Sequence, residues 1–161
     1  MNIYEFAKEK EKYSENYYRD LSEKCQNKGL KSIFSMLADE ELKHFNMVKE
    51  MEQKGRPSIA ETPILSDAKK IFQKMKDEKD IAGCGESQID LYSDARKFEE
   101  ESRDLYNKKA EEVDDEFQKN LFKKMAGEEQ KHYNLMENII QLVQRPERWL
   151  ENAEWHHLEE Y

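Results

Sequence analysis

The sequence is poor in the residues that make turns and cross-links. Its 161 residues include only 5 Gly, 3 Pro and 2 Cys. So few Gly and Pro argue against an all-β sandwich or barrel, which needs a turn about every ten residues, and favour a small number of long helices. The two cysteines, Cys25 and Cys84, form no CxxC pair. A disulfide framework and a zinc or iron site built from cysteines are therefore excluded.

Long apolar runs and an excess of positive charge are also absent. No stretch approaches the roughly 18 apolar residues that a membrane-spanning helix requires, and residues 1–11 lack the apolar segment of a signal peptide. The net charge is −9, with no basic patch that would attract nucleic acid or an anionic membrane surface. We therefore expect a cytoplasmic protein without nucleic-acid or membrane partners.

Apolar residues recur every three or four positions along four long segments, which is the spacing of amphipathic helices. The segments span Ile3–Asn27, Leu30–Lys54, Glu86–Glu112 and Asp115–Gln144. We expect Gly29 to end the first helix and Pro146 to end the fourth. The short joints near 27–29 and 113–115 predict two antiparallel hairpins.

A long link, residues 55–85, joins the two hairpins and holds one short amphipathic piece. Two helical hairpins joined by a long crossover have the connectivity of a ferritin-like four-helix bundle. We predict an all-α fold with this bundle over 1–144, in which hairpin one spans 1–54, the crossover 55–85 and hairpin two 86–144. The hairpins could pair within one chain or swap between two chains.

Residues 145–161 are predicted to form a separate, short helical tail. Its apolar residues are Trp149, Leu150, Trp155 and Leu158. Because exposed Trp side chains favour association, we expect the tail to dock on the bundle or on a second subunit. Our hypothesis is that the tail adds interface area to a homodimer. His156 and His157 are interpreted as ordinary surface residues.

An internal repeat relates the two hairpins. A shift of 88 residues, the interval from Glu11 to Glu99, aligns them without a gap. The chain therefore reads as two copies of one helical hairpin. The matched pairs include Tyr18 with Tyr106, Glu41 with Glu129 and His44 with His132.

Six polar residues occupy stripe positions where a bundle would bury apolar side chains. A buried, ionised Glu costs several kcal/mol unless it is paired, and no Lys or Arg lies beside these residues on the stripes. Two divalent cations would balance the four carboxylates, and oxygen and imidazole ligands suit iron or manganese. Each Glu-x-x-His pair also places two ligands on one helix face, as in di-metal bundles. The six candidate metal ligands are Glu11, Glu41, His44, Glu99, Glu129 and His132.

A lone Glu-x-x-His motif carries little weight in a chain so rich in Glu. A third match, Glu154 with His157, lies in the tail. The other two matches lie on apolar stripes, align in the repeat, and each has a stripe Glu on its partner helix. The alternative to a metal site is a polar layer that only fixes the register of the bundle.

Tyr18 and Tyr106 follow Glu11 and Glu99 by seven positions, on the same helix faces. Their hydroxyl groups could hydrogen-bond a metal-bound carboxylate and orient it. The alternative is that both are core aromatics whose hydroxyl groups are satisfied elsewhere.

Other residues near the stripes have simpler interpretations. Ser14 and Ser102 leave room near the metals. Glu40 and Glu128 repeat with the candidate ligands but point about 100° away from them around the helix, so we interpret them as part of a solvated face. Cys84, between two glycines, is interpreted as an exposed thiol.

These residues resemble the rubrerythrin branch of the ferritin-like superfamily over roughly residues 1–144. The resemblance rests on Glu11 with Glu41-Leu42-Lys43-His44, on Glu99 with Glu129-Gln130-Lys131-His132, and on the long crossover. Two features depart from the family. Typical members carry a rubredoxin-like domain with two CxxC pairs, which this chain lacks, and a second Glu three residues after the third-helix ligand, where this chain has Ser102.

The resemblance implies a non-haem di-iron oxidoreductase that acts in oxidative-stress defence. It would reduce peroxide or dioxygen with electrons from an external donor such as a rubredoxin-type protein. Manganese or zinc could stand in for the two iron ions. The alternatives are an iron-binding or metal-sensing module without turnover, and a purely structural helical bundle without metal.

Overall fold

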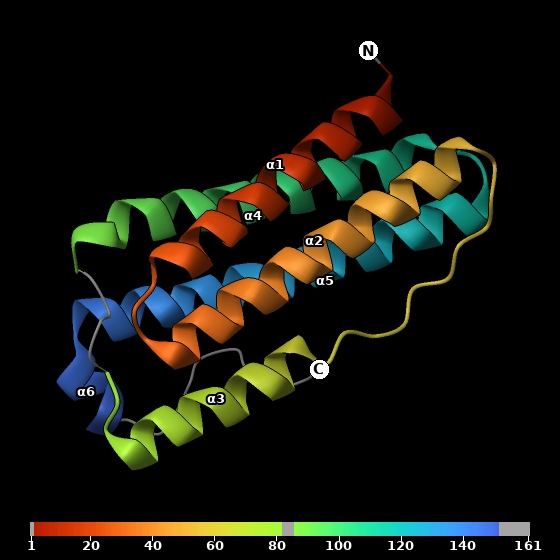
Figure 1. Ribbon diagram of the computed structural model, residues 1–161. Helices are drawn as coiled ribbons and strands as arrows, with labels where there is room; N and C mark the ends of the chain where they lie inside the picture. The colour runs from red at the N-terminus through yellow and green to blue at the C-terminus, as the bar shows by residue number, and fades with distance from the viewer. Residues whose placement is uncertain (1, 82–85, 152–161) are drawn as a thin grey trace.

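Four long helices form a bundle of two helical hairpins. The computed structural model describes residues 2–81 and 86–151, and these ranges contain helices and no strand. The long helices are α1 (Ile3–Lys24), α2 (Lys28–Glu52), α4 (Ile89–Glu112) and α5 (Glu116–Gln144). Figure 1 shows α1 beside α4 and α2 beside α5, so the two hairpins pack against each other. The predicted all-α, ferritin-like bundle is confirmed.

The other described elements are α3 (Ile64–Glu78), the 3-10 turn η1 (Glu86–Gln88) and α6 (Pro146–Glu151). An extended segment runs from the end of α2 along the outside of the bundle to α3, which packs on α2 and α5 (Figure 1). Within the described ranges, no helix has the length and apolar character needed to cross a membrane. The residues from the sequence analysis that lie outside the described part are Cys84, Glu154, Trp155, His156, His157, Leu158 and the side chain of Leu150.

Polar caps start the second helix of each hairpin. Asn27 Oδ1 accepts a hydrogen bond from the Leu30 N–H at 3.0 Å, and Asp115 Oδ1 accepts one from the Phe117 N–H at 3.3 Å. These caps satisfy backbone donors that the first turn of a helix leaves unpaired. Asn27 also donates its side-chain N–H to the Asp80 carbonyl at 3.1 Å, which ties the first hairpin turn to the crossover. Both turns are thereby held short and the hairpins antiparallel.

Gly29 does not end the first helix, so that prediction was wrong. It lies in the first turn of α2, and α1 already ends at Lys24. A Cβ atom at Gly29 would lie only 2.6 Å from Met75 Sδ and 3.1 Å from Ile71 Cγ2. Glycine lets the Met75 and Ile71 side chains of α3 pack directly on α2 at this point, a contact between distant segments that local sequence does not reveal.

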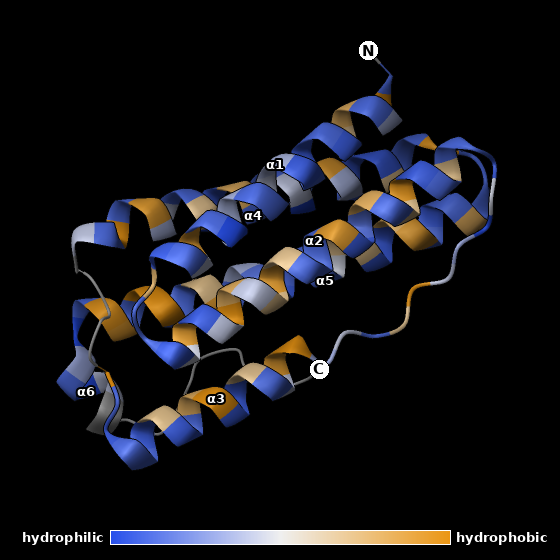
Figure 2. Ribbon diagram, viewed as in Figure 1, coloured by the Kyte–Doolittle hydropathy of each residue, from blue (hydrophilic) through white to orange (hydrophobic). Residues whose placement is uncertain are grey.

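The apolar core consists of two clusters separated by a polar layer. The first cluster includes Phe34, Leu37, Phe72 and Leu135, and the second includes Val48, Met51, Phe122 and Met125. In each long helix, polar stripe residues fall between the two clusters. In α1, for example, Glu11 lies between Ala7 of the second cluster and Tyr18 of the first. Figure 2 shows the amphipathic character of these helices, in which apolar and polar residues alternate along each ribbon.

The described part of the tail docks on its own chain. Trp149 of α6 is buried, and its ring packs edge-on against Phe72 of α3 with the ring centroids 5.3 Å apart. Both rings belong to the first apolar cluster, which also contains the buried thiol of Cys25. The crossover helix α3 and the short helix α6 therefore both pack on the first apolar cluster.

We predict that Phe72→Ala lowers the free energy of unfolding by about 3–5 kcal/mol, because it leaves a cavity beneath Trp149. Urea denaturation followed by circular dichroism measures this change. The matched control is Phe6→Ala, since Phe6 is 46% exposed and its loss should cost no more than about 0.5 kcal/mol. A cost for Phe72→Ala as small as that of the control would show that α3 is not part of the core in solution.

Candidate metal centre

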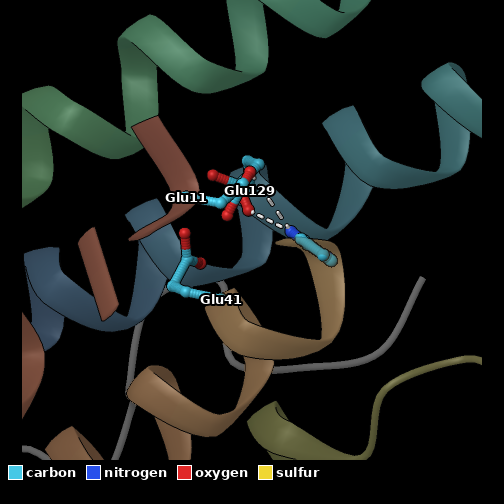
Figure 3. A group of neighbouring side chains, drawn as sticks. Glu11, Glu41 and Glu129 are labelled. Carbon is cyan, nitrogen blue, oxygen red and sulfur yellow. Dashed lines mark ion pairs between the residues drawn. The ribbon is translucent and has the colours of Figure 1, made fainter. Parts of the chain in front are cut away.

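Six side chains from the four long helices meet in the polar layer. Each is at most 1% exposed, and the sequence analysis had named all of them. Figure 3 shows the carboxylates of Glu11, Glu41 and Glu129 converging from three different helices. The full set is Glu11 of α1, Glu41 and His44 of α2, Glu99 of α4, and Glu129 and His132 of α5.

The six side chains form two overlapping groups. Within each group, the carboxylate oxygens and imidazole nitrogens lie within 4.8 Å of one another. Glu41 and Glu129 belong to both groups. The repeat exchanges the two groups, so the layer has approximate two-fold symmetry. The first group is Glu11, Glu41, His44 and Glu129, and the second is Glu41, Glu99, Glu129 and His132.

Each imidazole turns Nδ1 toward the centre of the layer. His44 Nδ1 lies 2.8 Å from Glu129 Oε1, and His132 Nδ1 lies 2.8 Å from Glu41 Oε1. Neither nitrogen makes a hydrogen bond of acceptable geometry with any described residue. The nitrogens and carboxylate oxygens are therefore close together without the geometry of a hydrogen bond, and a protonated imidazole pairs with the carboxylate only through its charge.

The other imidazole nitrogens contact two carboxylates that the sequence analysis had placed in solvent. His44 Nε2 lies 2.6 Å from Glu128 Oε1, and His132 Nε2 lies 3.4 Å from Glu40 Oε1. Glu128 is buried and the side chain of Glu40 is 13% exposed. The interpretation of Glu40 and Glu128 as a solvated face was wrong, because α2 and α5 lie side by side and each covers that face of the other.

A signal for these two residues was present in the sequence. Glu40 and Glu128 repeat at the same 88-residue shift as the candidate ligands, and each directly precedes a candidate Glu. The position of a residue around one isolated helix says nothing about which neighbouring helix covers it. A repeated acidic residue beside a buried ligand pair therefore indicates a partner across the bundle.

Tyr18 and Tyr106 each donate a hydrogen bond to a candidate ligand of the opposite hairpin. Tyr18 Oη lies 2.7 Å from Glu99 Oε1, and Tyr106 Oη lies 2.5 Å from Glu11 Oε1. Both rings are buried, and burial followed by the nearby carboxylates raises the pKa of each phenol well above its ordinary value. The phenols therefore stay protonated and act as donors.

Most carboxylate oxygens of the layer accept no hydrogen bond from any described residue. None of the four carboxylates forms an ion pair with a described Lys or Arg. Ionised oxygens in a dry interior cost several kcal/mol without such partners. The unpaired atoms are Glu11 Oε2, Glu99 Oε2 and both oxygens of Glu41 and of Glu129.

The dimensions of each group suit a divalent ion. Atoms on opposite sides of an ion with ligand bonds of about 2.0–2.2 Å lie about 4.4 Å apart, which is within the 4.8 Å spread of each group. Four carboxylates also carry the charge that two divalent cations neutralise. The residues present therefore fit two divalent ions in size, charge and donor type.

The pKa values of the Glu and His side chains in the layer reflect the same excess of negative charge. Burial, and then the neighbouring carboxylates, raise the pKa of Glu41 and Glu129 well above the ordinary 4.5. Burial alone would also raise the pKa of Glu11, but its contacts with His44 lower it. Burial opposes the charging of His44 and His132, yet the surrounding carboxylates raise the pKa of both well above 6.5. Protons thus occupy the place that cations would take.

Ser14 and Ser102 are buried three residues after Glu11 and Glu99. They place a neutral hydroxyl group at related positions of the two hairpins. Because position 102 holds a serine, α4 contributes only one carboxylate, Glu99, to the layer. The six Glu and His side chains are therefore distributed equally between the two hairpins.

The sequence was compared with models of known protein families, with curated proteins and with solved structures. The sequence model of the rubrerythrin family matches residues 2–140, which is most of the chain and includes all six side chains of the layer. No curated protein and no solved structure matches the chain significantly. The family match covers the same helices that build the bundle and its buried layer of Glu and His. This chain therefore belongs to the rubrerythrin family.

Proposed function

We propose that the polar layer binds two iron ions and that the protein reduces peroxide or dioxygen with electrons from an external donor. The observation that carries this proposal is the set of buried carboxylate oxygens without hydrogen-bond donors in the two overlapping groups. The membership of the rubrerythrin family supports iron over other divalent ions. Manganese and zinc accept the same kinds of donor atoms.

The arrangement of the groups supports a specific division of roles. Glu41 and Glu129 belong to both groups, so both carboxylates would help to hold each of the two ions. Glu11 with His44 would complete one ion's ligands, and Glu99 with His132 the other's. Each ion would then be held by side chains from both hairpins, so that binding would fasten the hairpins together.

The residues around these ligands would fix their orientation and protonation. In a neutral imidazole, donation of the Nε2 proton to Glu128 or Glu40 leaves the Nδ1 lone pair directed into the layer. The phenols of Tyr18 and Tyr106 would hold Glu99 and Glu11 in place and keep a proton beside the centre. The ligands are thereby oriented before an ion binds.

The chemistry follows from the ions and from the surroundings of the layer. Two ferrous ions would supply one electron each to a peroxide, and with two protons this yields two molecules of water. The buried apolar clusters on both sides of the layer exclude bulk water from the centre. An external one-electron donor, such as a rubredoxin-type protein, is proposed to supply the electrons for each further turnover.

A second candidate function is metal binding or sensing without turnover. The observation that favours it is Ser102, which stands where rubrerythrins tend to have a further carboxylate ligand. The symmetric set of six side chains would bind two ions equally well in either case. Consumption of peroxide separates the two functions.

We predict about two iron ions per chain after anaerobic reconstitution with ferrous iron, as two-metal sites bind. Elemental analysis gives the metal content, and an absorption spectrum recorded before and after peroxide gives the oxidation of the iron. Ferric absorption that returns with each cycle of reduction and peroxide addition would support the oxidoreductase. Iron binding without peroxide consumption would support the sensing module, and no iron above trace would leave only a structural polar layer.

The double variant Glu41→Leu/Glu129→Leu tests which residues hold the metal in this experiment. It removes both carboxylates that the two groups share, so iron should fall to trace levels. The metal-free variant should also be more stable than the metal-free wild type, by about 1–4 kcal/mol, because buried carboxyl groups without hydrogen-bond partners are replaced by apolar volume. Glu111→Leu, on the exposed surface of α4, serves as the control and should retain full iron binding.

The raised pKa values predict how stability depends on pH. Glu41, Glu129, His44 and His132 bind protons more tightly in the folded, metal-free protein than in the unfolded chain. Their contribution to stability is therefore present at low pH and lost as the pH rises through the folded pKa values. The lowered pKa of Glu11 acts oppositely, but only below its ordinary value of 4.5.

We accordingly predict that the Tm of the metal-free protein falls between about pH 5 and pH 9. The Tm of the iron-loaded protein should rise over the same range, because protons and metal ions compete for the same atoms. Differential scanning calorimetry at constant ionic strength measures both curves. A metal-free Tm that increased with pH would contradict the clustering of these groups.

The contacts between His and the outer carboxylates predict a loss of metal affinity on substitution. Glu40→Ala and Glu128→Ala should each weaken metal binding about 10–100-fold, because the imidazole loses the acceptor that orients it. Competition with a chromophoric chelator measures the affinity. Glu137→Ala is the control, since Glu137 lies farther along α5 and pairs with Arg96. Unchanged affinity in both outer variants would mean that these contacts do not support the ligands.

A further inference from the structure

A cleft opens on the surface of the bundle next to the polar layer. It has a volume of about 380 Å³ and lies between residues 59–61 of the extended segment and the side of α5. The α5 residues that line it are Lys124, Gly127, Glu128 and Lys131. One water molecule takes about 30 Å³ in the liquid, so a molecule of a few atoms can enter the cleft freely.

Glu128 connects this cleft to the candidate metal centre. Its side chain lines the cleft, is only 7% exposed, and contacts His44 Nε2 at 2.6 Å. On its other side, the His44 ring presents Nδ1 to Glu129 and Glu11. One carboxylate and one imidazole therefore separate the cleft from the centre of the layer.

Gly127 leaves the cleft open, and packing does not require a glycine there. A Cβ atom at this position would meet no atom within 4 Å. Glycine in the middle of a helix lowers its stability relative to alanine, so the residue carries a cost without a local structural reason. The repeat-related residue is Asp39, whose exposed side chain pairs with Arg19 at 2.9 Å. The same helix position therefore accepts a full side chain in the other hairpin.

The repeat-related outer carboxylate has different surroundings. Glu40 contacts His132, and after burial and His132 the nearby hydroxyl group of Thr62, a buried residue of the extended segment, helps to lower the pKa of Glu40. Thr62 therefore lies near Glu40. Beside Glu128, residues 59–61 and α5 form the two sides of the cleft, and Lys131 pairs with Glu61 across it at 3.6 Å. A second cleft, beside the repeat-related Asp39 and Lys43, does not include Glu40 in its lining, whereas Glu128 lines the cleft on α5 directly.

We propose that this cleft is the access route by which a small oxidant reaches the candidate metal centre, with Gly127 setting its width and Glu128 forming its inner wall. The proposal rests on the proposed function. The lysine side chains and the Glu128 carboxylate offer hydrogen-bond donors and an acceptor to a molecule such as hydrogen peroxide, which is both donor and acceptor. A displacement of the Glu128 side chain then admits the molecule beside His44.

The test uses cobalt(II)-loaded protein and azide, so that access is measured apart from turnover. Stopped-flow absorption gives the rates of azide binding and release in the wild type, Gly127→Ala and Gly127→Trp. We expect Gly127→Trp to slow both rates by about ten-fold or more, because a blocked route raises one barrier for both directions. The Kd should stay unchanged. Gly127→Ala should keep wild-type rates and melt at a higher temperature.

Asp39→Trp is the matched control, since it adds the same side chain at the repeat-related position outside the cleft. It should leave both azide rates unchanged. Equal rates in Gly127→Trp and the wild type would overturn the access route, as would a Gly127→Trp variant that changes Kd alone. The proposed reaction would be overturned if the wild type binds cobalt but, when loaded with iron, does not consume peroxide. The azide rates would still decide whether the cleft is the access route. Failure to bind any cobalt would overturn both.

Discussion

The burial of four carboxylates in one layer is the constraint on which the rest of the structure depends. Their negative charge lies between two apolar clusters and has no Lys or Arg partner among the described residues. The two imidazoles supply the nearest positive charge, and the pKa values of Glu41 and His44 are both raised as protons are drawn into the layer. A fold that keeps such an arrangement loses stability at every pH where these groups ionise without a cation. Binding of divalent ions would remove this destabilisation, and its free energy would add to the stability of the folded four-helix bundle.

The internal repeat explains how a chain of two similar hairpins builds one centre. Contacts around the layer cross from one hairpin to the other. Tyr18 donates to Glu99, Tyr106 donates to Glu11, and His44 contacts Glu128. Each hairpin therefore orients ligands that belong to its partner, and neither hairpin contains a complete group of candidate ligands. The symmetric pairing gives specificity to a hairpin interface whose neighbouring helices are otherwise joined mainly by apolar packing.

Residue positions that depend only on the periodicity of one helix could be predicted from the sequence. Positions that depend on which neighbouring segment packs there could not. Glu41 and His44 could be predicted because their spacing puts both on the stripe that a helix must bury. Glu128 could not be placed in the same way, since the helix that covers it is known only once the hairpins are packed. Gly29 was misread as a helix stop for the same reason, because its role is set by Met75 of α3. The sequence of the extended segment has no periodic pattern that predicts its path. The position of Thr62 near Glu40 and the cleft beside Glu128 therefore could not be predicted.

The two halves of the layer are alike in their ligands and unlike in their surroundings. The repeat preserves the Glu and His residues that face the centre, while it has diverged at Asp39 and Gly127 on the outside. The extended segment is present once in the chain, so it can cover only one half in a given way, and Thr62 lies near Glu40 while Glu128 lines the cleft on α5. Symmetry in the ligands is what two equal ions require, because each needs the same charge and donor atoms. Asymmetry around them is what a reaction with a small molecule requires, because water must be kept out on one side while the reactant is admitted on the other.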